Sequence, residues 1–246
     1  MPEVRASVPE VTVIEKVKKA AARGIRMILR RIDDYLAFLE ACWLEHKKPR
    51  AADAPTVISL FAGCGGSSLG YSMAGFRELL AVEWDGHAVA TFKANFPDVP
   101  VYHGDIAKLS VEEILRTTGL QPGELDVLDG SPPCQGFSTA GRRKMDDGRN
   151  QLFREYIRLL RGLQPKVLVM ENVSGMVKGK MKLIFVEILR ELKDSGYHVS
   201  ARLMNAMYYG VPQSRQRMIF VGVRQDLWEK LSREEASHEA SPGSAD

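Results

Sequence analysis

The sequence predicts an α/β protein in which a helical extension precedes an open, doubly wound and mostly parallel sheet. Three observations support this fold class. From Thr56 onward, short apolar runs alternate with helical stretches, which is the rhythm of βαβ units. A glycine turn in the segment SLFAGCGGSSLG, residues 59–70, joins the first apolar run to a helix. Polar, glycine-rich loops follow several apolar runs, where open α/β sheets place their chemistry.

The apolar runs set the expected elements of the sheet. Strands are expected at 56–61, 79–84, 99–102, 125–128, 167–170, 199–203 and 218–223. Helices are expected near 151–163 and 182–194, where apolar side chains recur with helical spacing. No internal repeat interrupts this order.

The chain divides into three parts. Residues 1–50 hold an amphipathic helix and most of a linker, residues 56–224 form the α/β domain, and residues 225–246 are a polar tail whose composition indicates disorder. The helix is expected from residue 11 to residue 46 because apolar side chains recur every three or four positions. These side chains are Val13, Val17, Ala21, Ile28, Ile32, Leu36, Leu39 and Trp43.

Composition excludes several classes of protein. The chain has 246 residues and 45% hydrophobic content, enough for one sizeable core. It has no apolar run long enough to span a membrane and its N-terminus is charged, so we expect a cytoplasmic protein. Cys42, Cys64 and Cys134 lack ligand spacing, which argues against a metal site or a disulfide framework. The net charge of +3 is compatible with a polyanion partner but does not require one.

The glycine turn is followed by carboxylates at the ends of the next two strands. Glu83 lies 20 residues beyond Gly63, where a carboxylate can bond the hydroxyls of a ribose. Trp84 offers a flat face for an adenine, and Asp105 can accept from an exocyclic amine. Because the turn lacks GxxxxGK[ST], a nucleoside cofactor fits better than a triphosphate. A plain structural turn and ordinary helix-capping acids are the alternatives.

A polar loop, DGSPPCQGFSTAGRRK, follows the strand at 125–128. Pro132 and Pro133 fix the backbone before Cys134. A lone cysteine is often a small buried hydrophobe. The two prolines, the glycine at 136 and the polar surroundings favour an exposed nucleophile instead.

Six motifs in this chain resemble those of the cytosine-5 DNA methyltransferases. They are SLFAGCGG, VEWD, GDI, GSPPCQGFS, ENV and QSRQR, and they occur in family order between Ser59 and Arg217. The ordered set is far more specific than any one motif. It implies the Rossmann-like fold of enzymes that use S-adenosylmethionine and release S-adenosylhomocysteine.

The resemblance also implies a role for each matched residue. Cys134 would attack carbon 6 of cytosine, Glu171 would donate a proton or hydrogen bond to nitrogen 3, and Arg217 would contact the oxygen at position 2. Asn172 would hold the loop geometry and Arg215 would support the nucleophile loop or contact the target nucleotide. The implied cofactor-binding residues are Phe61, Ala62, Gly63, Cys64, Gly65, Gly66, Glu83, Trp84, Asp105, Ile106, Pro133 and Leu152. In QSRQR, residues 213–217, alternation along a strand would put Arg215 and Arg217 on the same side. An ordinary ion pair is the alternative for Glu171, and solvated strand charges are the alternative for the arginines.

The expected partners follow from the same resemblance. Double-stranded DNA is the expected substrate, in a bacterial cytoplasm where the protein associates with the nucleoid and serves a restriction-modification system. No target-recognition domain is recognised in the chain, so we expect either a split enzyme with a second subunit or a fragment. The N-terminal helix is expected to cover the cofactor side, to dock the partner or to be a plain appendage. A transfer-RNA methyltransferase and a non-catalytic regulatory subunit are the competing functions.

Overall fold

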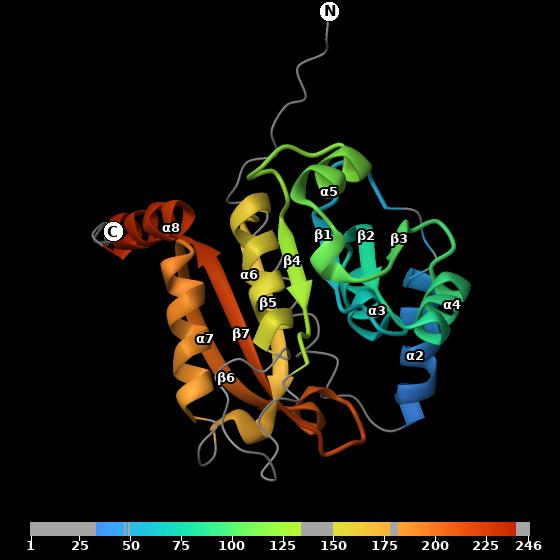
Figure 1. Ribbon diagram of the computed structural model, residues 1–246. Coiled ribbons are helices and arrows are strands. Elements are labelled where there is room, and N and C mark those ends of the chain that lie inside the picture. Colours follow the sequence, from blue (N-terminus) through green and yellow to red (C-terminus); the bar gives the residue numbers. More distant parts are fainter. Residues whose placement is uncertain (1–32, 47, 49, 134–149, 178–181, 240–246) are drawn as a thin grey trace, which may run out of the picture.

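The computed structural model describes residues 33–46, 48, 50–133, 150–177 and 182–239 (Figure 1). Within them, one seven-stranded sheet has the order β3-β2-β1-β4-β5-β7-β6. Its strands are β1 (Thr56–Leu60), β2 (Arg77–Glu83), β3 (Val101–His103), β4 (Val127–Gly130), β5 (Val167–Val173), β6 (Tyr197–Asn205) and β7 (Gln216–Arg224). The strands from β3 to β5 pair in parallel, whereas β7 is antiparallel to both of its neighbours. The predicted doubly wound, mostly parallel sheet is confirmed.

Helices pack on both faces of this sheet. On one face, α5 (Val111–Thr118), α6 (Asn150–Leu163) and α7 (Lys182–Asp194) bury the main core against residues such as Leu128 and Phe220. On the other face, α3 (Gly66–Met73) and α4 (Gly86–Asn95) cover β1 and β2. Short 3₁₀ helices η1 (Ile106–Lys108), η3 (Ser174–Val177) and η5 (Ala206–Tyr209) follow three of the strands.

Part of the predicted N-terminal helix is described, as α2 (Asp33–His46). The end of α2 is fixed to α3, because the His46 ring bonds the Ser72 hydroxyl through Nδ1 at 2.7 Å. Arg50 Nη2 also donates to the Ser72 carbonyl oxygen at 2.5 Å, and the His46 ring meets Phe96 edge-on. The remainder of the predicted helix, residues 11–32, lies outside the described residues.

The C-terminal stretch corrects the sequence analysis. We predicted a disordered polar tail from residue 225, but residues 225–239 form α8 (Gln225–Glu239). Two apolar side chains in this polar segment explain the difference: Leu227 is buried, and the Trp228 ring stacks on His198 of β6 with centroids 3.8 Å apart. Residues 240–246 lie outside the described part of the chain.

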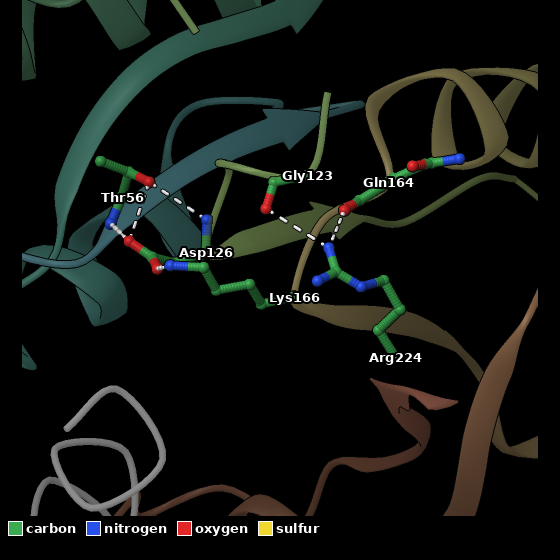
Figure 2. A network of polar contacts seen from close by, with 6 residues as sticks. All are labelled: Thr56, Gly123, Asp126, Gln164, Lys166 and Arg224. Carbon is green, nitrogen blue, oxygen red and sulfur yellow. Dashed lines mark hydrogen bonds and ion pairs between the residues drawn. The ribbon is translucent and has the colours of Figure 1, made fainter. Parts of the chain in front are cut away.

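A polar network joins the strands at the amino edge of the sheet (Figure 2). The Asp126 carboxylate accepts from the Thr56 backbone N–H at 2.7 Å and pairs with Lys166 Nζ at 2.9 Å. Arg224, at the end of β7, donates to the carbonyl oxygens of Gln164 and Gly123. Because these bonds hold the starts of β1, β4 and β5, they stabilise the edge opposite to the one where α/β sheets bind ligands.

The ring of Tyr156 packs closely on Gly130, the last residue of β4. A Cβ added at Gly130 would lie 2.8 Å from the ring of Tyr156, which is fully buried and donates from its hydroxyl to backbone oxygens of β4 and β5. We expect Gly130→Ala to lower the free energy of unfolding by about 1–3 kcal/mol, as overpacked cores do. Urea denaturation measures this. Gly175→Ala is the matched control, since a Cβ there meets nothing within 4 Å, and a loss of comparable size in that variant would contradict the steric explanation.

Two carboxyl groups face α3 in the interior of the domain. Burial raises the pKa of Glu78 to about 7 and the pKa of Asp129 to about 6. The hydroxyl of Tyr71 donates to Asp129 at 3.3 Å and partly offsets the shift there. Ser59 and Ser68 partly offset the shift at Glu78, although neither hydroxyl reaches hydrogen-bond geometry with that carboxyl.

These raised pKa values predict a stability that falls as pH rises. The folded protein binds the Glu78 proton more tightly than the unfolded chain does, so this contribution is full below the unfolded pKa and is lost as pH rises through about 7. The loss from Glu78 is of order 3 kcal/mol. We expect Glu78→Gln to flatten the dependence of unfolding free energy on pH between about pH 5 and about pH 8. An unchanged slope in urea titrations, or an equal change in the exposed control Glu187→Gln, would contradict this.

Candidate functional site

The predicted site residues gather along one edge of the sheet. The glycine turn leaves β1, Glu83 ends β2, Asp105 follows β3, and Pro132 and Pro133 follow β4. Antiparallel pairing places the start of β7 beside the end of β5, with Val173 opposite Arg217. The structure therefore brings the motifs after β1, β2, β3, β4 and β5 to the carboxyl edge, where open α/β sheets bind ligands.

The glycine turn has backbone angles that its glycines permit. Gly63 and Gly65 have φ angles of +56° and +90°, a region that side chains disfavour. A Cβ at Gly65 would also collide with Phe96 at 2.6 Å, whereas Cβ atoms at Gly63 and Gly66 would meet nothing within 4 Å. Gly65 thus serves the packing of the turn, and the other two glycines leave open space above it.

The Glu83 carboxylate holds this turn against β2. One oxygen accepts from the Gly63 backbone N–H at 2.8 Å, and the other accepts from the backbone N–H groups of Trp84 and Asp85, each at 2.9 Å. A carboxylate has about four acceptor positions, so about one remains. Glu83 can therefore accept one ribose hydroxyl directly, and a second would have to displace an amide.

The remaining residues proposed for the cofactor differ in exposure. Trp84 is 76% exposed and presents its ring to solvent, while Ile106 is 4% exposed. Asp105 caps η1 by accepting from the Ala107 N–H at 3.0 Å through one oxygen, so the capping alternative holds for that oxygen. Its other oxygen has no hydrogen bond within the described residues. The other residues of the set are exposed (Cys64, Pro133), half-buried (Phe61, Leu152) or buried (Ala62).

Glu171 and Arg217 form an ion pair across β5 and β7. Arg217 Nε lies 2.7 Å from Glu171 Oε1, and the two side chains are 27% and 31% exposed. Arg217 also donates through Nη1 to the Gln216 carbonyl oxygen. The ion-pair alternative for Glu171 therefore holds in this structure, at a position where both side chains remain accessible from the carboxyl edge.

Asn172 connects β5 to the loop that leads to Cys134. Its Nδ2 donates to the Pro132 carbonyl oxygen at 3.2 Å, and its Oδ1 accepts from the Val173 N–H. The side chain is 3% exposed, so this bond is shielded from water. Cys134 itself lies outside the described residues, as do residues 135–149 with Arg142, Arg143 and Lys144.

Arg215 does not lie on the strand that we predicted for it. β7 begins at Gln216, and the Arg215 carbonyl oxygen instead accepts from the Ala206 N–H at 3.0 Å in the preceding turn. The alternation that was to place Arg215 beside Arg217 therefore does not apply. Arg215 is exposed on this turn.

Beside Arg215 lies an apolar surface that the sequence analysis missed. It consists of Met207, Tyr208, Tyr209 and Val211, which are 50%, 70%, 48% and 43% exposed. We call these four residues the η5 patch. The sequence contained a signal for this surface, because two tyrosines directly precede Gly210, and a glycine at that place predicts a turn rather than a buried strand.

Two further observations concern metal groups and membrane spans. No group of three or more His, Cys, Asp or Glu side chains that could hold a metal occurs among the described residues. None of the helices described is both long enough and apolar enough to cross a membrane.

Comparisons with known proteins agree with the motifs found at the carboxyl edge of the sheet. A family model of C-5 cytosine-specific DNA methylases matches residues 55–244. The type II methyltransferase M.NgoPII of Neisseria gonorrhoeae is 41% identical over 190 residues, covering 77% of this chain and 54% of the relative. M.AquIA of Picosynechococcus is 44% identical over 177 residues, covering 68% and 71%. A putative DNA modification methyltransferase from an E. coli prophage superposes with a TM-score of 0.62 at 37% identity, covering 71% and 48%.

The sheet order and the strand-end motifs define a Rossmann-like methyltransferase fold. The chain belongs to the C-5 cytosine-specific DNA methylase family. It spans about half the length of most of the curated relatives it matches.

Proposed function

We propose that this chain transfers a methyl group from S-adenosylmethionine to carbon 5 of cytosine in double-stranded DNA. The observation that carries the proposal is the meeting of two sets of residues at one edge. The Glu83-bound glycine turn lies at the carboxyl end of β1, and the Glu171–Arg217 pair and the Asn172-held loop lie at the ends of β4 and β5. Family membership supports the same reaction.

The residues around the glycine turn fit this cofactor. Open space above Gly63 and Gly66 leaves room for its amino-acid part. One acceptor position of Glu83 remains for a ribose hydroxyl, Trp84 is exposed for an adenine ring, and Asp105 retains an oxygen for the exocyclic amine. When bound, S-adenosylmethionine supplies an electrophilic methyl group.

Cys134 would supply the nucleophile. Its thiolate adds to carbon 6 of the cytosine, and the electron pair displaced from the ring double bond makes carbon 5 nucleophilic. Glu171 donates a proton or hydrogen bond to nitrogen 3, and Arg217 contacts the oxygen at position 2. After methylation, loss of the carbon 5 proton to a base, which we take to be water, and release of Cys134 restore the aromatic ring.

Because carbon 6 is inaccessible inside a stacked duplex, we propose that the cytosine is rotated out into the site, at a cost of a few kcal/mol. Arg142, Arg143 and Lys144 follow the nucleophile in sequence and would contact phosphates, an attraction that weakens as salt rises.

We further propose that a second chain supplies sequence recognition. The η5 patch supports this, since four exposed apolar side chains beside a catalytic edge are typical of a contact surface.

Tritium transfer from labelled S-adenosylmethionine tests the function. We expect label in duplex DNA when the chain is assayed with extracts or subunits that complete it, and little label with the chain alone. Label in transfer RNA instead of DNA would assign the substrate to the RNA branch of the family. Robust sequence-specific methylation by the isolated chain would overturn the need for a partner.

Glu83→Gln tests the binding role assigned to the strand-end acid. Glutamine has one acceptor oxygen in place of two, so it cannot accept from the Gly63, Trp84 and Asp85 amides and from a ribose hydroxyl at the same time. We expect cofactor affinity to fall by about 10-fold to 100-fold, in line with the loss of a charged hydrogen bond. Calorimetric titration with S-adenosylhomocysteine measures it. Asp98→Asn, at an acid that lies outside this site, is the control, and equal losses in both variants would contradict the assignment.

A further inference from the structure

His103 ends β3 beside the turn that carries Glu83 and Trp84. β3 runs alongside β2 (Figure 1), and the register places His103 opposite Glu83. The Nε2 atom of His103 lies 3.1 Å from the Trp84 carbonyl oxygen. Because a carbonyl oxygen can only accept, Nε2 carries a proton and donates it to this bond. A side chain of β3 therefore holds the backbone that follows β2.

The backbone of Trp84 is held from two sides. Its N–H donates to Glu83 Oε1 at 2.9 Å, and its carbonyl oxygen accepts from His103. The imidazole ring also lies against the start of α4, since a Cβ added at Gly86 would meet His103 Cε1 at 3.7 Å. The indole ring, by contrast, is 76% exposed. The structure therefore fixes where the Trp84 side chain leaves the backbone, although most of the ring lies in solvent.

His103 also lies close in sequence to Asp105, the acid assigned to the exocyclic amine of the cofactor. The Gly104 N–H donates to the Glu83 carbonyl oxygen at 3.1 Å, and Asp105 is fixed as the cap of η1. His103 thus connects the residue assigned to the face of the adenine, Trp84, with the residue assigned to its amine. A base that must stack and hydrogen-bond at once binds more tightly when both groups are already in place.

We propose that His103 is a positioning residue for the cofactor. Its bond to the Trp84 carbonyl oxygen holds the indole ring where an adenine can stack on it and still reach Asp105. The inference rests on the proposed binding of S-adenosylmethionine at this edge, and it adds a residue that lies outside the six motifs. His103 need not touch the cofactor in this role, because it acts through Trp84.

Substitutions at position 103 of the full chain test this bond. His103→Phe keeps a ring but removes the donor, and we expect the dissociation constant for S-adenosylhomocysteine to rise about threefold to tenfold, the range of one lost neutral hydrogen bond. His103→Gln offers a donor amide at a similar reach and should restore most of the affinity. His87→Phe, at an exposed histidine of α4, is the matched control and should bind like the wild type. Calorimetric titration measures all four proteins.

A double-mutant cycle with Trp84 separates positioning from a general structural effect. Trp84→Leu removes the flat ring but keeps an apolar side chain, and in that background His103→Phe should change the affinity by less than about twofold. An equal effect of His103→Phe in both backgrounds, or no effect beside an intact Trp84, would overturn the inference and leave the proposed cofactor standing. A wild-type chain that binds no S-adenosylhomocysteine would overturn the cofactor assignment, and this inference with it.

Discussion

Cys134→Ala should reduce methyl transfer by at least about a thousand-fold, because without a nucleophile carbon 5 of cytosine is not activated. The loss should appear in turnover rather than in binding, since the side chain that positions the loop is Asn172, through its bond to the Pro132 carbonyl oxygen. Tritium transfer in the completed enzyme measures turnover, and duplex retention on a filter measures binding. Cys42→Ala, which alters a cysteine of α2, should retain full activity.

The same position should form a covalent adduct with DNA that carries 5-fluorocytosine. Fluorine at carbon 5 cannot leave as a proton, so the bond from Cys134 to carbon 6 should persist through denaturing electrophoresis. Cys134→Ala should form no such band. A complex in which Cys134→Ala leaves the activity unchanged would instead make this chain a regulatory subunit. An adduct that forms through another residue would contradict the assigned nucleophile while leaving the reaction class intact.

The fold could be predicted from the sequence where a strand is buried on both faces, because such a strand appears as a run of apolar residues. The runs at 56–60 and 167–173 are mostly apolar, and both form interior strands of the sheet. Strand ends were harder to predict, because Arg215 was assigned to β7 although the strand begins one residue later. The helical C-terminus was missed because Leu227 and Trp228 are few among polar neighbours, and their packing on β6 depends on long-range contacts.

The candidate site was predictable as an ordered set of motifs but not as a set of contacts. Spacing placed Glu83 near Gly63, yet only the structure shows that the carboxylate already bonds three amides. Likewise, the sequence does not indicate that Glu171 and Arg217 pair, since they lie 46 positions apart and the pairing depends on the antiparallel register of β7. The sequence analysis did not single out Glu78, because the desolvation that raises its pKa depends on α3 packing over β2 and cannot be read from the strand itself.

Glu171→Gln should lower methyl transfer by about 10²-fold to 10⁴-fold, the usual contribution of a positioned acid. Glutamine keeps the shape of the side chain and can still donate a hydrogen bond to nitrogen 3, but it cannot deliver a proton. The variant therefore separates the two roles assigned to Glu171. A loss of less than about tenfold would mean that hydrogen bonding is sufficient.

The free energy of unfolding distinguishes the catalytic role proposed for Glu171 from that of a merely structural ion pair. Glu171 and Arg217 are each about a third exposed or less, and a solvent-screened pair contributes at most about 1 kcal/mol. We therefore expect urea unfolding of Glu171→Gln to change by less than that while turnover falls steeply. The matched control is Glu191→Gln, which breaks the Arg161–Glu191 pair of 3.0 Å on α6 and α7, and it should change neither property by much.

Arg217 is expected to act on the same cytosine as Glu171. The two side chains contact each other at 2.7 Å, so a cytosine that enters the site must either separate them or contact both. Arg217→Met should accordingly weaken trapping of the 5-fluorocytosine adduct even though Cys134 is intact.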